Sequence, residues 1–280
     1  MKTLKLTLLC CLFSAFSFAE ISQTQKDALV AIYNATNGDS WMQSWDLEQP
    51  VSGWYGLSIE NDNVVAINLS FNNLNGKLPE EISALTALKI LNLSFNKLEG
   101  ELPSTLINIA SLEDLKLFSN NFSGAIPKNI GNLTNLKYLE LYNNNFFGEI
   151  PASIGSLKKL ESLILSSNLL MGKLPSSISN LKSLKVLSLF DNSLLGTIPS
   201  SIGQLSQLEE LVLSNNAFYG NLPNELAQLT NLKTLLLSNN AFKGNYAVLK
   251  GQLPKIVDFD LDEANMKGAL ATLDSDDDDD

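Results

Sequence analysis

The chain has 280 residues, 45% of them hydrophobic, which is enough for one large folded unit or two smaller ones. Its formal charge is −11, all 19 basic residues are lysine, and it contains neither histidine nor arginine. This composition argues against nucleic-acid binding, which depends on cations that neutralise phosphates, and against histidine-based acid–base catalysis.

Residues 1–19, "MKTLKLTLLCCLFSAFSFA", are predicted to be a signal peptide. Lys2 and Lys5 supply its positive start, an apolar run follows, and small residues precede a cleavage point at Glu20. The alternative is an N-terminal membrane anchor, which the shortness of the apolar run disfavours.

Cleavage would also remove Cys10 and Cys11, the only cysteines, and would change the formal charge from −11 to −13. We therefore predict an exported protein (secreted, periplasmic or cell-surface) with no membrane span after cleavage. Without a thiol it cannot form disulfides, so its stability must come from burial and hydrogen bonds.

Residues 20–63 precede the repeats and are predicted to form an N-terminal helical and aromatic cap. In "KDALVAIYNAT", apolar residues follow a helical period: Ala28, Leu29, Ile32 and Tyr33. All three tryptophans follow: Trp41, Trp45 and Trp54. We expect them to cover the apolar edge of the first coil, and a sugar-stacking platform is the alternative.

Residues 64–270 contain a repeat with a fixed period of 24, in eight regular copies and a degenerate ninth. Each regular copy has one asparagine: Asn72, Asn96, Asn120, Asn144, Asn168, Asn192, Asn216 and Asn240. A glycine follows each asparagine four residues later, and seven copies continue to a proline. Such a period predicts a solenoid, in which each coil buries its apolar face only against its neighbours.

Each coil is predicted to contain one strand with a buried face. Leu91 and Leu93 alternate with Asn92 and Ser94, which is the period of a strand. Stacked in register, the nine strands would form one parallel sheet.

The repeated asparagine ends each strand, where the chain turns and leaves backbone groups without partners in the sheet. Because an amide side chain is both donor and acceptor, we predict that the eight asparagines form a buried structural ladder. The glycine permits a backbone bend, and the proline leads into a short 3-10 or irregular turn. Ile130 and Leu133 lie three apart, as such a turn on the outer side requires.

The motif LxxLxLxxN followed by xLxGxLPxxI resembles the leucine-rich repeat, over residues 64 to about 270. Its GxLP part resembles the subclass seen in plant receptor ectodomains and polygalacturonase-inhibiting proteins. The resemblance implies an α/β solenoid, a horseshoe or superhelix with a parallel β-sheet on the concave face, which is the family's usual binding surface. The segment "GWYGLSIENDNVVAINL" is similar to the flank of secreted members, but the cysteine pairs of the plant flank are absent, which favours a bacterial exported protein.

The ninth coil has Ala264 in the asparagine position, so the ladder is predicted to stop there. Residues 271–280 are an acidic tail, which we interpret as a solvated segment that prevents end-to-end stacking. Cation binding near the acidic end is the alternative, although the spacing is not that of an EF-hand loop.

No catalytic constellation is found, and we predict no enzyme activity, no cofactor and no metal site. Outward positions on each strand lie six, four, two and one residue before the asparagine. The position two before it is serine in five of nine coils, and aromatic residues replace it on coils three, four and six. The predicted ligand-binding residues are Lys116, Phe118, Tyr138, Glu140, Tyr142, Ile164, Phe190 and Asp191.

Aromatic side chains that face water on adjacent coils indicate a binding surface. The alternative is neutral drift, with neighbouring rings stabilising one another. We predict a non-enzymatic exported monomer that recognises a protein or peptide, not nucleic acid, through its strand face. The alternative is a carbohydrate or cell-surface adhesion module. A regular lattice such as ice is disfavoured because the outward columns are heterogeneous.

Overall fold

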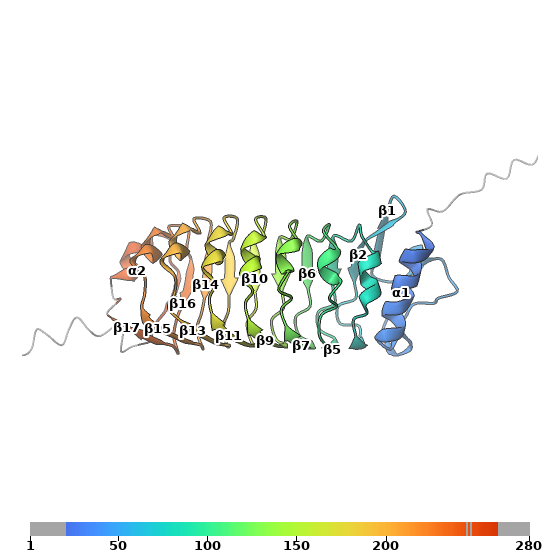
Figure 1. Ribbon diagram of the computed structural model, residues 1–280, viewed down its shortest axis with the longest axis horizontal. Coiled ribbons are helices and arrows are strands. Elements are labelled where there is room, and N and C mark those ends of the chain that lie inside the picture. Colours follow the sequence, from blue (N-terminus) through green and yellow to red (C-terminus); the bar gives the residue numbers. More distant parts are fainter. Residues whose placement is uncertain (1–20, 245, 247, 263–280) are drawn as a thin grey trace, which may run out of the picture.

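The computed structural model describes residues 21–262 except 245 and 247. The predicted signal peptide, the end of the ninth coil and the acidic tail lie outside the described residues. The coils stack in a single row, with α1 (Gln23–Ala35) at one end and α2 (Leu249–Gln252) near the other (Figure 1).

Ten strands form the main sheet, whose outward side we call the strand face. They are β1 (Leu57–Glu60), β2 (Asn63–Asn68), β4 (Ile90–Asn92), β6 (Asp114–Lys116), β8 (Tyr138–Glu140), β10 (Ser162–Ile164), β12 (Val186–Ser188), β14 (Glu210–Val212), β16 (Thr234–Leu236) and β18 (Asp258–Asp260). β1 pairs antiparallel with β2, and every later pairing is parallel, which confirms the predicted sheet. Leu91 pairs with Leu115 and Leu115 with Leu139, so neighbouring strands are offset by the 24-residue period.

A second sheet of eight short strands runs along the solenoid, and the sequence analysis did not predict it. Its strands are β3 (Asn75–Lys77), β5 (Lys97–Gly100), β7 (Asn121–Ala125), β9 (Asn145–Glu149), β11 (Leu169–Lys173), β13 (Ser193–Gly196), β15 (Ala217–Asn221) and β17 (Ala241–Lys243). These strands pair at an offset of 22 residues, as Asn75 does with Lys97 and Phe147 with Leu169. In this sheet, a residue therefore pairs with the residue of the next repeat that stands two positions before its own repeat equivalent. Asn75, for example, pairs with Lys97 and not with Glu99.

The repeat glycine lies in this second sheet with a left-handed backbone. Its φ is 78° at Gly100 and 84° at Gly124, a region that residues with a Cβ rarely adopt. The bend predicted from the sequence is therefore the reason that each copy has glycine here.

Short 3-10 helices form the opposite side of the coils, as predicted. The two in the N-terminal part are η1 (Gly38–Ser40) and η2 (Val51–Gly53), and the repeats contain η3 (Glu80–Ala84), η4 (Leu106–Asn108), η5 (Ile130–Asn132), η6 (Ala152–Ser156), η7 (Ser176–Asn180), η8 (Ser200–Gln204) and η9 (Asn224–Gln228). Pro151, Pro175 and Pro199 directly precede η6, η7 and η8, each with a φ of −67°. The ring of proline favours this φ, so the repeat proline fixes the entry into each turn.

The repeat asparagines connect neighbouring coils inside the stack. Asn120 Nδ2 donates to Leu93 O at 2.9 Å and to Leu117 O at 3.0 Å, and Asn120 Oδ1 accepts from Leu98 N at 3.0 Å. Corresponding bonds occur at every repeat from Asn96 to Asn240. At the first coil, Asn72 bonds instead to both backbone groups of Gln43.

The N-terminal segment buries its aromatic residues at the end of the stack. The apolar face of α1, which includes Leu29 and Ile32, is buried, and all three tryptophans are buried. Each indole N–H donates to a backbone carbonyl: Trp41 to Thr36, Trp45 to Tyr55, and Trp54 to Asp46 and Gln49. The alternative of a tryptophan platform for sugar stacking is therefore wrong, because these rings face the core.

Candidate functional site

The centre of the strand face is built by β6 and β8, which lie side by side (Figure 1). Parallel pairing places Asp114 beside Tyr138 and Lys116 beside Glu140. The intervening leucines point inward, so these four side chains project outward together. We call Asp114, Lys116, Tyr138 and Glu140 the central cluster.

Lys116 is held within the central cluster. Its Nζ lies 3.0 Å from Asp114 Oδ2, and the two side chains are only 28% and 18% exposed. The same Nζ lies 5.5 Å from the centroid of the Tyr138 ring, within the range of a cation–π contact. Burial alone would lower the pKa of Lys116, but the bond to Asp114 and the nearby Glu140 raise it overall. The lysine therefore stays charged and is already neutralised within the protein.

The two carboxylates of the cluster have acceptor capacity left. Asp114 Oδ1 is buried, and among the described residues no donor reaches it. Partial burial raises the pKa of Glu140, and the charge of Lys116 only partly opposes this shift. A ligand that brings a donor or a cation would stabilise Glu140, whereas the buried Asp114 Oδ1 is open to a ligand only if its side chain turns outward.

Four rings form a continuous contact series beside the cluster, which we call the aromatic row: Phe71, Phe95, Phe118 and Tyr142. Phe118 stacks on Tyr142 with centroids 4.3 Å apart and an interplanar angle of 9°. Phe95 meets Phe118 edge-on at 5.0 Å and stacks on Phe71 at 3.9 Å. Burial and the carboxylate of Glu140 raise the pKa of the Tyr142 hydroxyl, which connects the row to the central cluster.

The structure brings together five of the predicted binding residues: Lys116, Phe118, Tyr138, Glu140 and Tyr142. Ile164 lies beside Glu140 on β10 and is half-buried. Phe190 and Asp191 are exposed two coils beyond Tyr142, with Ser166 at the intervening position. The sequence predicted an aromatic patch on coils three to six. In the structure, the rings that contact one another lie on coils one to four.

Sequence reasoning missed Phe71, Phe95 and Asp114. All three occupy the outward positions that the repeat defines, so the signal was present in the sequence. Our prediction gave most weight to the position two residues before the asparagine, which holds Phe118 and Tyr142, whereas Phe71 and Phe95 lie one before it and Asp114 lies six before it. Phe95 and Phe118 occupy different positions relative to the asparagine, but their rings touch because they lie on neighbouring coils.

Alternating charges mark the start of the strands, seven residues before each asparagine. Lys137 pairs with Glu113 and Lys185 with Glu161, both at 2.7 Å, and Lys233 pairs with Glu209 at 2.5 Å. These side chains neutralise one another and are well exposed. These three lysines therefore do not provide a cationic binding surface.

The described part of the chain offers no metal centre, because no three histidine, cysteine, aspartate or glutamate side chains lie close enough to hold an ion. No helix in the described ranges is long and apolar enough to cross a bilayer.

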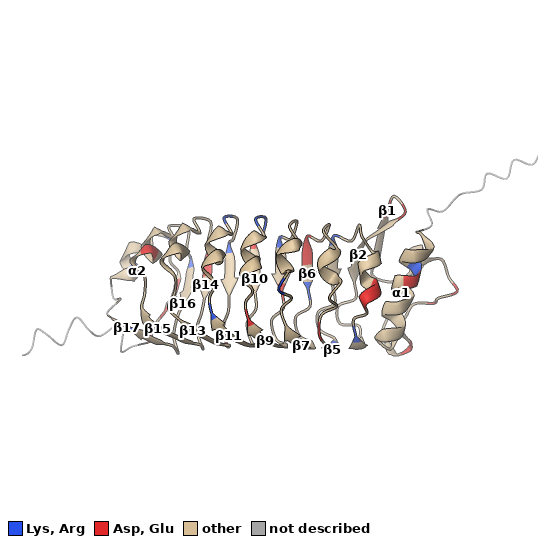
Figure 2. Cartoon of the chain, viewed as in Figure 1, with Lys and Arg blue, Asp and Glu red and all other residues tan. Residues whose placement is uncertain are grey.

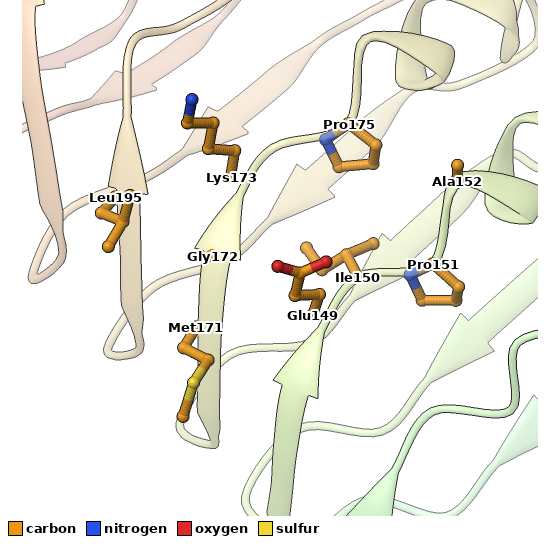
Figure 3. A pocket seen from close by; sticks show the side chains of 9 residues that line it. All are labelled: Glu149, Ile150, Pro151, Ala152, Met171, Gly172, Lys173, Pro175 and Leu195. Atoms are coloured by element: carbon orange, nitrogen blue, oxygen red, sulfur yellow. The ribbon is translucent and has the colours of Figure 1, made fainter.

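A hollow lies on the second sheet, with a volume of about 630 Å³. Met171 and Leu195 line it together with Ile150 and the prolines Pro151 and Pro175, and Glu149 and Lys173 are its charged residues (Figure 3). It continues an exposed apolar series that contains Phe147, Leu169, Met171, Leu195 and Tyr219. Sequence reasoning missed this surface because it did not predict the second sheet.

Comparison with known proteins gives one consistent family. The family model described as "Leucine Rich Repeat" matches residues 63–85 and 87–109, and the one described as "Leucine-rich repeat region" matches residues 115–250. A probable leucine-rich repeat receptor-like protein kinase of Arabidopsis thaliana is 39% identical over 82 residues, which are 29% of this chain and 8% of the kinase.

Similar solved structures include plant receptor ectodomains. The Arabidopsis receptor kinase HAESA, in complex with the peptide hormone IDA and the co-receptor SERK1, has a TM-score of 0.77 and 32% identity, over 86% of this chain and 41% of that one. PEPR1 with AtPEP1 has a TM-score of 0.75 and 34% identity, over 80% and 32% of the two chains. This chain therefore spans less than half the length of these receptors.

A plant ice-binding protein is also similar, with a TM-score of 0.77 and 25% identity, over 87% of this chain and 79% of that one. These relatives and neighbours come from plants, and they do not support the bacterial origin inferred from the missing cysteine pairs.

Proposed function

This chain belongs to the leucine-rich repeat proteins, and from that premise we propose that it is an exported, non-enzymatic monomer that recognises a peptide or protein through its strand face. The observation that supports this most is the meeting of the aromatic row and the central cluster on neighbouring strands. Folding requires neither group, because the coils are held by buried leucines and the asparagine ladder. The similar receptor HAESA is bound to the peptide hormone IDA, which favours the same class of partner.

The packing of the rings favours a peptide over the carbohydrate alternative. Stacking on a sugar requires a free aromatic face. Phe71 stacks on Phe95, Phe118 stacks on Tyr142, and the Lys116 ammonium lies over the Tyr138 ring. Each stacked pair therefore has only its outer faces and its edges left for a ligand, and ring edges pack against apolar side chains and aromatic faces. We do not propose ice recognition. A regular lattice would need the same outward residue on every coil, but Phe118, Tyr142 and Phe190 replace the serine that stands two residues before the asparagine in five coils.

The proposal is tested by presenting a displayed random-peptide library and a glycan array to the intact chain. We expect enriched peptides and no enriched glycan. Tyr142→Ala and Phe118→Ala should abolish peptide binding and lower the melting temperature by only a few degrees, because both side chains lie outside the leucine core and lose only their ring contacts. Ser214→Ala, the same position on coil seven, is the matched control and should bind as the wild type does.

Glycan enrichment that depends on Tyr142 would instead support the adhesion alternative. Loss of the fold in Tyr142→Ala would show that the rings are structural, and the proposed function would fail.

A further inference from the structure

The aromatic row extends the site toward the N-terminal end of the solenoid. Phe71 and Phe95, on coils one and two, are 62% and 40% exposed. They contact each other, and Phe95 contacts Phe118 on coil three. The site therefore covers coils one to four as one surface.

Both phenylalanines occupy a backbone conformation that bulky residues avoid. Their φ angles are 54° and 55°, in the left-handed region. The same position in the next six coils also has positive φ, but it holds short polar residues: Ser119, Asn143, Ser167, Asp191, Asn215 and Asn239. Bulky side chains with positive φ are outliers that concentrate at functional positions. The fold does not demand phenylalanine here, because other coils form the same turn without it.

The charge of the strand face is strongly negative. In the described coils, its outward positions hold these carboxylates: Asp114, Glu140, Asp191, Glu210, Asp258, Asp260 and Asp262. They hold one lysine, Lys116, which is paired with Asp114. Along β6, an acidic segment is followed by a basic one (Figure 2). With a chain charge of −11, this surface attracts cations and repels anionic ligands.

The central cluster provides a specific place for a cationic group. Asp114 Oδ1 is buried without a donor among the described residues, Asp114 Oδ2 pairs with Lys116, and Glu140 lies beside Lys116 on the neighbouring strand. Tyr138 lies on the same strand as Glu140, and Tyr142 follows the end of that strand. Carboxylates next to aromatic rings form a favourable environment for an ammonium or guanidinium group.

We propose that the occupant of this face is an extended, cationic peptide segment. Its basic side chain binds at Glu140, next to the Lys116–Asp114 pair, and a nearby apolar side chain packs on Phe71 and Phe95. This inference rests on the proposed function and specifies its ligand. Three strand spacings of about 4.8 Å separate coils one and four, a distance of about 14 Å that roughly four or five extended residues cover.

The test uses the peptides that a random-peptide library yields on the intact wild-type chain. We expect them to contain a lysine or arginine within roughly four or five residues of an apolar residue. Replacing that basic residue by glutamine in a synthetic peptide should weaken binding at least about tenfold, as should Glu140→Gln in the protein. Affinity should fall between about 0.05 M and about 0.5 M NaCl, because salt screens the attraction.

Two protein variants separate the contributions of charge and rings. Phe95→Asn introduces the residue that several other coils have and should weaken binding about tenfold without lowering the melting temperature. Glu99→Gln removes the same charge as Glu140→Gln, but from the exposed side of the second sheet. It should change the affinity by less than about twofold, since its charge is remote and screened.

Enriched peptides that are neutral or acidic, and still depend on Tyr142, would overturn the cationic ligand and leave the proposed function intact. Failure to enrich any peptide, or binding that Tyr142→Ala does not affect, would overturn both.

Discussion

Coils one to four and coils five to eight have the same interior and different surfaces. Leu139 and Leu211 are both fully buried, and Asn120 and Asn216 both donate to the preceding coil at 2.9 Å. On the strand face, the first group carries the aromatic row and the central cluster, whereas the second carries mostly serine, asparagine and aliphatic residues. The comparison separates what the solenoid requires, which both groups share, from what it leaves free.

The largest expected effect tests the shared interior. Leu139→Ala and Leu211→Ala should each lower the free energy of unfolding by about 2–5 kcal/mol, because each removes a fully buried side chain and leaves a cavity. Urea denaturation of both variants measures this. A loss confined to one group of coils would show that their interiors are not equivalent.

A smaller effect tests the strained position of the phenylalanines. Ser167→Phe places a bulky ring at a φ of 52° on coil five, and should lower the free energy of unfolding by about 1–3 kcal/mol. Phe95→Asn should be nearly neutral, because relief of the strain offsets the lost ring contacts, worth about 0.5–1.5 kcal/mol each. If Ser167→Phe were tolerated without loss, the argument from strain would be wrong.

The smallest effect is the pH dependence of Glu140. Burial raises its pKa, so the folded protein binds this proton more tightly than the unfolded chain does, and ionisation lowers stability. Glu140→Gln should therefore be more stable than the wild type above the folded pKa of Glu140. The difference should shrink as the pH falls through that pKa and vanish below the unfolded value of about 4.3.

Glu113 is the matched control with the opposite sign. Its bond to Lys137 lowers the pKa of Glu113, so its ionised form stabilises the fold. Glu113→Gln should be less stable than the wild type above the unfolded pKa of Glu113, and this difference should disappear as the pH falls through the folded pKa. Thermal melts of both variants across this pH range check the two signs, and equal signs would contradict the assigned environments.

The repeat made much of the fold predictable from the sequence. A fixed period determines which residues stack, so the leucine layers, the parallel sheet and the 3-10 turns followed from the spacing of Leu91, Asn96 and Gly100. The second sheet did not follow, because its strands pair at an offset of 22 residues, which differs from the repeat period of 24. The repeat period contains no information about that offset.

The candidate site was only partly predictable. The repeat identified outward columns and therefore Phe118, Tyr142 and Lys116. Contacts between columns were not accessible, since Phe95 reaches Phe118 only through side-chain conformations that a position count does not provide. For Trp41, Trp45 and Trp54, the sequence predicted that they cover the apolar edge of the first coil, but not which backbone carbonyls their indole N–H groups reach.

The central claim is that the strand face of coils one to four, rather than the second sheet, binds the ligand. The most direct measurement is photo-crosslinking of an enriched peptide that carries a photoreactive group beside its basic residue, followed by mapping of the labelled residues. We predict labels on the strand face around Glu140 and Tyr142. Labels around Met171 and Leu195 on the second sheet would contradict the claim.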